Sequence, residues 1–284
     1  MSFNTLHNTF SMTDEDFERI RGWVRDLIGI KLSDAKRQMV YARLTRRLRI
    51  HGFGDFGSYL DYVESGVDDE LVHFKNAITT NLTSFFREPH HFEYMENTIL
   101  PEIKIRAGAG KKEIRVWSAG CSTGEEAYSI AMTVDRVFSP RAGWDIKILA
   151  TDIDTNVLHH GKEAVYQKEK VKTVSEELIR DDLEPVTGDS NVVRVKKHLR
   201  NMVVFNQLNL MAENWPMKKK FDIIFCRNVM IYFDKPTQHR LVTRYWNLLK
   251  DDGYLLLGHS ESLFGVNQQY KLMGKNIYKK IQNV

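Results

Sequence analysis

The first 80 residues carry apolar side chains at the three- and four-residue spacing of amphipathic helices. Thr13 is a suitable N-cap for the first of these helices, which ends at Gly29. Three further helical patterns follow, at residues 33–52, 56–63 and 71–78. No strand pattern appears before about residue 113, so we expect an N-terminal all-helical domain over residues 1–78.

Beyond residue 113 the pattern changes to short apolar runs, which are typical of strands buried on both faces of a parallel sheet. These runs lie at residues 114–119, 146–151, 202–205, 221–226, 253–258 and 276–281. The alternation of strands with helical patterns predicts an α/β domain with a mostly parallel sheet over residues 113–284. Residues 79–112 are expected to form a linker and a connecting helix. The charged stretch 165–201 is expected to form a small inserted subdomain with a hairpin.

Length and composition restrict the function only loosely. A chain of 284 residues can bury two modest cores, and its net charge of +4 does not by itself indicate nucleic acid. No apolar run reaches the length of a membrane span, and the N-terminus lacks the pattern of a signal peptide. Cys121 and Cys226 provide neither a disulfide framework nor a zinc-binding spacing. We therefore expect a cytoplasmic protein without a metal site and without direct membrane insertion.

The most informative stretch is the turn after the first strand, Ala119 to Gly124, which leads directly into Glu125 and Glu126. The next strand ends at Asp152, and an acid at this position of an α/β sheet accepts hydrogen bonds from ribose hydroxyls. The two glutamates would repel a pyrophosphate, whereas S-adenosylmethionine offers a ribose, no phosphate and a positive charge. The alternative is a plain strand–turn–helix whose glycines serve only the backbone, because lone glycine motifs are weak signals.

Polar or small residues follow four of the predicted strands, at Gly120, Asp152, Asn209 and Asn228. Ligands of parallel sheets bind outside the carboxyl ends of the strands, so these four residues are expected to converge on one edge. Any one of them alone is more typical of a turn. Their joint placement favours a binding site that includes Gly120.

The second helical pattern is strongly basic and contains no acid between residues 36 and 49. Its cations are Lys36, Arg37, Arg43, Arg46, Arg47 and Arg49. Like charges on one helix repel each other when no acidic partner lies one turn away, which indicates a docking surface for an acidic partner. We assign Lys36, Arg43, Arg46 and Arg47 to that surface. A solvated face without a partner is the alternative.

Several motifs resemble the chemotaxis receptor methyltransferases, the CheR family. They lie at residues 81–88, 117–126, 150–154, 225–233 and 258–262, and the match runs in order from about Thr13 to Ile281. The resemblance implies a Rossmann-like class I methyltransferase with an N-terminal helical domain and an antiparallel insertion. It implies a protein-glutamate O-methyltransferase that uses S-adenosylmethionine, releases S-adenosylhomocysteine and esterifies glutamates on the cytoplasmic helices of chemoreceptors.

The resemblance also implies the residues of the site. Those that would contact the cofactor are Asn81, Thr83, Arg87, Glu126, Asp152, Asn209, Leu210, Arg227 and Asn228. We expect Arg87 and Tyr232 to line the transfer site and orient the incoming carboxylate, while Arg87 is also a candidate for holding the carboxylate of the cofactor. The chain departs from the family at Ala127, where proline is frequent, and the insertion is its least matched segment.

Two other classes of function remain open from the residues alone. A nucleic-acid methyltransferase would use the same cofactor fold, but adenine-N6 enzymes place a proline-containing motif after the fourth strand, where this chain has Arg227 to Met230. A non-enzymatic protein that binds the cofactor and docks on receptors is the second alternative. We expect chemoreceptors as partners and no binding of nucleic acid.

Overall fold

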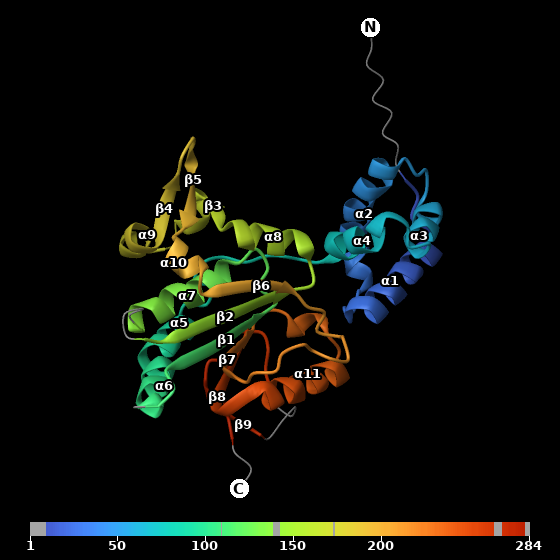
Figure 1. Ribbon diagram of the computed structural model, residues 1–284. Coiled ribbons are helices and arrows are strands. Elements are labelled where there is room, and N and C mark those ends of the chain that lie inside the picture. The colour runs from blue at the N-terminus through green and yellow to red at the C-terminus, as the bar shows by residue number, and fades with distance from the viewer. Residues whose placement is uncertain (1–9, 109, 139–142, 173, 264–268, 282–284) are drawn as a thin grey trace. The chain divides into compact units, whose positions relative to one another are not determined.

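The computed structural model describes residues 10–108, 110–138, 143–172, 174–263 and 269–281 (Figure 1). The chain divides into two compact units, Met1–Thr80 and Asn81–Val284. Within the described residues, none of the helices combines the length and the apolar character needed to cross a lipid bilayer.

Unit 1–80 is entirely helical in its described part, as the periodicity predicts. Its helices are α1 (Asp14–Ile28), α2 (Arg37–His51), α3 (Phe56–Glu64) and α4 (Glu70–Ile78), with 3-10 turns at Asp34–Lys36 and Val67–Asp69. Thr13 forms a capping box with Asp16, and Gly29 ends α1 in the left-handed conformation at φ 75°. Apolar side chains from all four helices, among them Phe17, Leu44, Tyr59 and Phe74, are buried in the core.

The second unit contains a seven-stranded sheet in the order β6-β2-β1-β7-β8-β10-β9. The strands are β1 (Glu113–Ala119), β2 (Asp145–Asp152), β6 (Val203–Gln207), β7 (Phe221–Cys226), β8 (Leu249–Leu257), β9 (Tyr270–Gly274) and β10 (Ile277–Lys280). The first five are parallel to one another, and β10 pairs antiparallel with β8 and with β9. All six predicted strands are confirmed. The sequence interpretation missed β9, because its burial is mixed and it lacks an apolar run.

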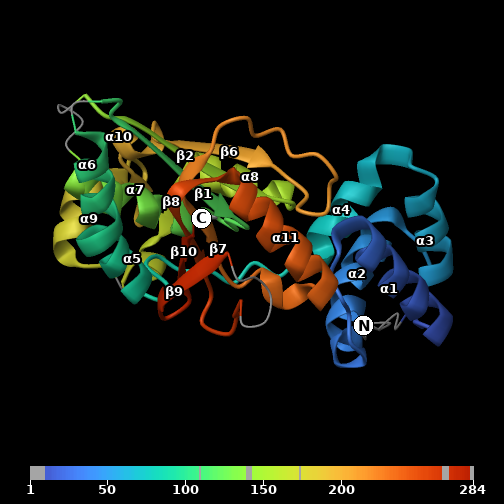
Figure 2. The same ribbon diagram turned by 90° about the horizontal axis from the view of Figure 1, so that it is seen from below.

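Helices cover both faces of this sheet, which explains its nearly continuous apolar strands. They are α5 (His90–Tyr94), a π-turn (Met95–Ile99), α6 (Leu100–Ala107), α7 (Glu125–Val137), α8 (Thr155–Glu163) and α11 (Lys235–Leu248). Alternate residues of one strand serve opposite faces, since Val116 packs with α6 and α7 and Trp117 with α11. Figure 2 shows α11 across the sheet on the side nearer the viewer.

The insertion forms a separate three-stranded antiparallel sheet in the order β3-β5-β4 (Figure 1). Its elements are β3 (Val165–Gln167), a 3-10 turn (Lys168–Val171), α9 (Glu176–Asp182), β4 (Leu183–Val186), β5 (Asp189–Val195) and α10 (Lys197–Arg200). The hairpin turns at Gly188, whose φ of 90° favours glycine. The predicted fold class is therefore confirmed: a helical unit, a mostly parallel α/β sheet and a small antiparallel insertion.

Candidate functional site

The order of the strands creates a switch point between β1 and β7. From β1 the sheet continues through β2 to β6 on one side and through β7 to β8 on the other. Ligands of open α/β sheets bind at such a point, outside the carboxyl ends of the strands. Gly120, Asp152, Asn209 and Asn228 follow β1, β2, β6 and β7, so the expected convergence on one edge is confirmed.

The turn after β1 is held against β2. The amides of Gly120 and Cys121 both donate to the carbonyl of Thr151, at 2.8 and 2.9 Å. Gly120 has a φ of 91°, and a Cβ atom there would meet Val229 Cγ2 at 2.4 Å. The close neighbour of this glycine is thus the loop after β7. That contact already explains why a glycine is needed here, so a ligand close to the backbone is not needed as the explanation.

Asp152 combines burial with unused hydrogen-bonding capacity. Its Oδ2 accepts the amide of Ser122 at 2.9 Å, and its Oδ1 accepts the amide of Asp154 at 3.0 Å. A carboxylate offers about four acceptor positions, so these two bonds leave room for further donors such as hydroxyl groups. Burial raises the pKa of Asp152, although the amides oppose this shift.

Glu126 lies in the first turn of α7, the helix that follows the turn after β1. Its Oε1 accepts the hydroxyl of Ser118 at 2.6 Å, and its Oε2 lies 3.3 Å from Nη1 of Arg227. Burial raises the pKa of Glu126 even though Arg227 favours the ionised form. A cationic ligand would therefore stabilise this carboxylate further.

The segment 81–89 packs against the turn after β1. The side-chain amide of Asn81 donates to Asp154 at 2.8 Å, and the hydroxyl of Ser122 donates to the carbonyl of Asn81 at 3.1 Å. Arg87 donates to the carbonyl of Leu82 at 2.7 Å, which folds the segment onto itself. The segment thus places Asn81, the partly exposed Thr83 and Arg87 in the same unit as the sheet edge.

The two phenylalanines of this segment serve packing. Phe85 is 2% exposed and meets the ring of Tyr166 edge-on at 4.9 Å. Phe86 meets Phe92 at 5.2 Å, and its amide donates to the hydroxyl of Ser129 at 2.9 Å. The rings therefore anchor the segment to the α/β unit, and a position over the cofactor is not needed to explain them.

Arg227 is the central cation beneath the site. Its side chain is 2% exposed, and its guanidinium contacts Glu126, Glu88 at 3.5 Å and the backbone carbonyl of Arg87. It also lies 5.5 Å from the ring centre of Phe92. These contacts join the loop after β7, α7 and the segment 81–89, so Arg227 touches two of the other predicted site residues, Glu126 and Arg87.

The remaining predicted residues lie in the loops after β6 and β7. Asn209 accepts the amide of Met211 at 2.9 Å and shapes its own turn, while Leu210 is 9% exposed. Asn228 adopts the left-handed conformation at φ 59°. Tyr232 is partly exposed and is the last residue of a 3-10 turn that begins at Met230.

The sequence interpretation did not single out Glu88, His91 and Glu261. Burial opposes the ionisation of Glu88, but the hydrogen bond from His259 and the charge of Arg227 lower its pKa to about 2. Burial lowers the pKa of His91 to about 4. The sequence could have drawn attention to Glu88 and Glu261, because both lie inside the motifs that carry the family resemblance.

The basic helix α2 requires a correction. We expected its cations to lack partners within the protein, but Arg47 Nε donates to Glu70 Oε1 at 2.9 Å and Glu70 is 1% exposed. Arg43 donates to the carbonyls of Ile78 and Thr79 at the end of α4. The reason is tertiary, because α4 packs against α2 from another part of the chain. Lys36 and Arg46 are exposed.

Within the described residues, two groups bring carboxylate and imidazole atoms within 4.8 Å of one another. They are Glu88 with His90 and His91, and Asp135 with Asp182 and His198. Glu88 is already engaged by His259 and Arg227. The expectation of a site without metal stays a prediction.

Comparison with known proteins gives one consistent result. Residues 15–79 match the family described as "CheR methyltransferase, all-alpha domain", and residues 81–279 match "CheR methyltransferase, SAM binding domain". The chain is 43% identical over 271 residues to the chemotaxis protein methyltransferase of Escherichia coli (strain K12), covering 94% of this chain and 91% of that protein. It is 39% identical over 284 residues to the chemotaxis protein methyltransferase of Borreliella burgdorferi, covering 98% and 99%.

Similarity to solved structures is more distant. An rRNA methylase from Streptococcus thermophilus shares 11% identity with a TM-score of 0.37, covering 70% of this chain and all (100%) of that one. That score is too low to add to the assignment, which rests on the two family matches and the full-length relatives. The chain belongs to the CheR family of SAM-dependent chemotaxis protein methyltransferases.

Proposed function

We propose that this protein transfers the methyl group of S-adenosylmethionine to glutamate side chains on the cytoplasmic helices of chemoreceptors, forming methyl esters. The observation that carries the proposal is the pair of desolvated carboxylates, Asp152 and Glu126, at the switch point of a sheet whose family binds this cofactor. Both acids have raised pKa values, as expected for groups that await a complementary ligand.

The residues of the edge fit the parts of the cofactor. Asp152 would accept the ribose hydroxyls with its unused acceptor positions, and Glu126 would face the positive charge. Arg87 would hold the carboxylate of the cofactor. The further contacts are assigned to Asn81, Thr83, Gly120, Asn209, Leu210, Arg227 and Asn228. The contribution of Gly120 is the shape of the turn, and that of Arg227 is support of Glu126 from below.

The chemistry asks little of the protein beyond positioning. When bound, the cofactor supplies an electrophilic methyl group on a sulfonium. A glutamate with an ordinary pKa of about 4.3 is ionised at neutral pH and needs no general base. Arg87 and Tyr232 orient the incoming carboxylate and exclude water, which lowers the barrier through proximity and alignment. His259 is not required as a base, and its Nδ1 contacts Glu88 at 2.9 Å.

Receptor docking is assigned to the exposed part of helix α2. Lys36 and Arg46 are exposed, and neither forms an ion pair within the described part of the chain. Their charges would attract an acidic receptor surface and orient it during encounter. Arg43 and Arg47 support this surface from within the helical unit.

The test is methyl transfer from labelled cofactor to receptor-containing membranes. We expect base-labile label on receptor glutamates, located by mass spectrometry, and no label on RNA or DNA incubated in parallel. An Asp152→Ala variant provides the matched control, because it removes a cofactor contact and leaves helix α2 intact. Saturable cofactor binding without transfer to any receptor would contradict the proposal and favour a binding protein. Label on nucleic acid would favour the other enzyme class.

A further inference from the structure

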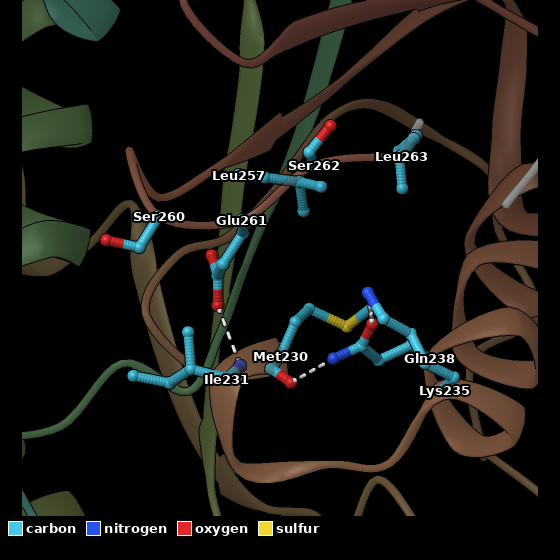
Figure 3. A pocket seen from close by; sticks show the side chains of 9 residues that line it. All are labelled: Met230, Ile231, Lys235, Gln238, Leu257, Ser260, Glu261, Ser262 and Leu263. Atoms are coloured by element: carbon cyan, nitrogen blue, oxygen red, sulfur yellow. Dashed lines mark hydrogen bonds between the residues drawn. The ribbon is translucent and has the colours of Figure 1, made fainter. Parts of the chain in front are cut away.

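Glu261 is a buried acid just beyond β8 whose carboxylate accepts hydrogen bonds from three backbone amides. The residue is 5% exposed. Its Oε2 accepts the amides of Gly258 at 2.6 Å and Asn228 at 2.9 Å. Its Oε1 accepts the amide of Ile231 at 3.2 Å, as Figure 3 shows. Within the described residues, no lysine, arginine or histidine lies within ion-pair distance of it. Its compensation for burial therefore comes from amides of two loops.

These bonds join the ends of β7 and β8. Gly258 follows β8 directly, whereas Asn228 and Ile231 belong to the loop after β7. The approach is close, because a Cβ atom on Gly258 would meet Asn228 Nδ2 at 2.5 Å and Asn228 N at 2.8 Å. A larger residue at Gly258 would push the loop away. The carboxylate thus fastens the two strand ends together at the edge where the site lies.

The loop held by Glu261 carries residues assigned to the site. Asn228 has a φ of 59°, a left-handed conformation that asparagine adopts more readily than most residues and that an external constraint can fix. The hydrogen bond from its amide to Glu261 is such a constraint. Tyr232 follows one residue after Ile231, whose amide is also bound. Glu261 therefore constrains the loop on both sides of Met230.

Packing alone does not hold this loop. A pocket of about 190 Å³ lies next to it, lined by Met230, Ile231, Leu257 and Leu263 together with the polar side chains of Lys235, Gln238, Ser260, Glu261 and Ser262. Figure 3 shows Glu261 beside this space, pointing toward the backbone of Ile231. Hydrogen bonds therefore add to the restraint on the loop: those to Glu261, and those from Gln238 Nε2 to the carbonyls of Met230 at 2.9 Å and Phe233 at 3.1 Å.

We propose that Glu261 is a positioning residue for methyl transfer, which acts by holding Asn228 and Tyr232 in the geometry that binds the cofactor and aligns the acceptor. This inference rests on the proposed function, since it gives Glu261 a role through residues assigned to the site there. A carboxylate with three amide donors is suited to this task because charged hydrogen bonds are stronger and more directional than neutral ones.

The experiment compares Glu261→Gln with Glu213→Gln, an acid-to-amide change on an exposed loop. The glutamine turns one acceptor oxygen into an NH2 group that opposes a backbone N–H. We expect Glu261→Gln to weaken binding of S-adenosylhomocysteine about tenfold and to lower kcat, with Glu213→Gln like wild type. If Glu261→Gln unfolds, Glu261→Asp keeps the charge on a shorter chain and should show a smaller loss of both quantities in the folded protein.

A double-mutant cycle with Asn228→Ala separates positioning from general stability. If Glu261 acts through Asn228, Glu261→Gln will add little to the loss of affinity caused by Asn228→Ala alone. Additive losses, or a lower melting temperature with unchanged affinity and kcat, would overturn the proposal. If Asn228→Ala itself leaves affinity unchanged, Asn228 does not contact the cofactor, and it is the site assignment under the proposed function that fails.

Discussion

Carboxylates shielded from water in the two units of this protein differ in how far the fold compensates them. Glu70, in the helical unit, is 1% exposed, and burial opposes its ionisation, yet hydrogen bonds from Arg47 and Tyr59 lower its pKa below the ordinary value. For Asp152 and Glu126, at the sheet edge, burial raises the pKa, and their hydrogen-bond and charge partners do not bring it back to the ordinary value. One acid is satisfied within the fold, and the other two are not.

The difference lies in how much of the cost of burial the fold itself offsets. Burying a charge costs free energy unless opposite charges and hydrogen bonds replace the lost water. Around Glu70 the protein supplies that replacement from two helices. At the sheet edge it supplies two amides to Asp152, and it supplies the hydroxyl of Ser118 and the guanidinium of Arg227, at 3.3 Å, to Glu126. Under the proposed function, a ligand with hydroxyl groups and positive charge would supply the rest of the compensation.

The largest effect is expected from breaking the satisfied pair. Arg47→Ala leaves Glu70 buried without its cation and should lower the free energy of unfolding by about 2–4 kcal/mol at pH 7. The neighbouring Arg46→Ala, on the exposed face, should change it by less than about 0.5 kcal/mol. Urea titrations of both variants measure the difference. Equal, small effects would show that the contact with Glu70 contributes little.

The same pair predicts a pH dependence. The folded-state pKa of Glu70 is lowered, so its stabilisation is present above the unfolded value of about 4.3 and is lost as pH falls through the folded value. The penalty of Arg47→Ala should therefore be full at pH 7 and shrink as the pH falls below about 4. A penalty that stays constant down to pH 3 would contradict an ionised Glu70.

Asp152→Ala should weaken cofactor binding by about 2–3 kcal/mol, or roughly 30- to 150-fold, because charged hydrogen bonds are the strong ones. Asp145→Ala, at the other end of β2 with a side chain that is 55% exposed, serves as the control. Calorimetric titration with S-adenosylhomocysteine measures both. An affinity within about twofold of wild type would remove Asp152 from the site.

Cofactor affinity should also depend on pH, and it should decrease as the pH falls. The pKa values of Asp152 and Glu126 are raised in the protein without ligand. A bound cation and hydroxyl donors would favour the ionised carboxylates. At a pH where these carboxyl groups are protonated, cofactor binding would therefore release protons. Affinity should decrease as the pH falls through these raised pKa values, by at most about tenfold per pH unit for each group. Calorimetry in buffers of different ionisation enthalpy detects the released protons. Affinity that is constant from pH 7 to 5 would mean that both acids are already ionised.

The smallest effect is expected at the docking surface. Charge reversal at Lys36 and Arg46 should lower receptor methylation about three- to tenfold at low salt and leave cofactor affinity unchanged, because it acts on encounter. Reversal of the exposed Lys218 and Lys219 changes the net charge equally and is the control. Added salt should reduce the difference as screening shortens to about 8 Å at physiological ionic strength. Equal activity of both double variants would make α2 a solvated face.

The convergence of residues at the sheet edge was largely predictable because parallel strands share one direction. Apolar runs locate the strands, and parallel strands bring their carboxyl ends to one side, so Asp152 and Asn228 converge whatever their side chains do. The antiparallel strand β9 escaped, since its exposed positions leave no apolar run to detect.

The sequence by itself determined the two kinds of fold, the edge where the site lies and the motifs that identify the family. Only the tertiary structure decided which charges are satisfied. Arg47 meets Glu70 across 23 positions of the chain, and Glu261 meets the amide of Asn228 across 33. Periodicity describes a residue relative to its own element, whereas hydrogen bonds and ion pairs form between elements, so their partners become known only when the chain is folded.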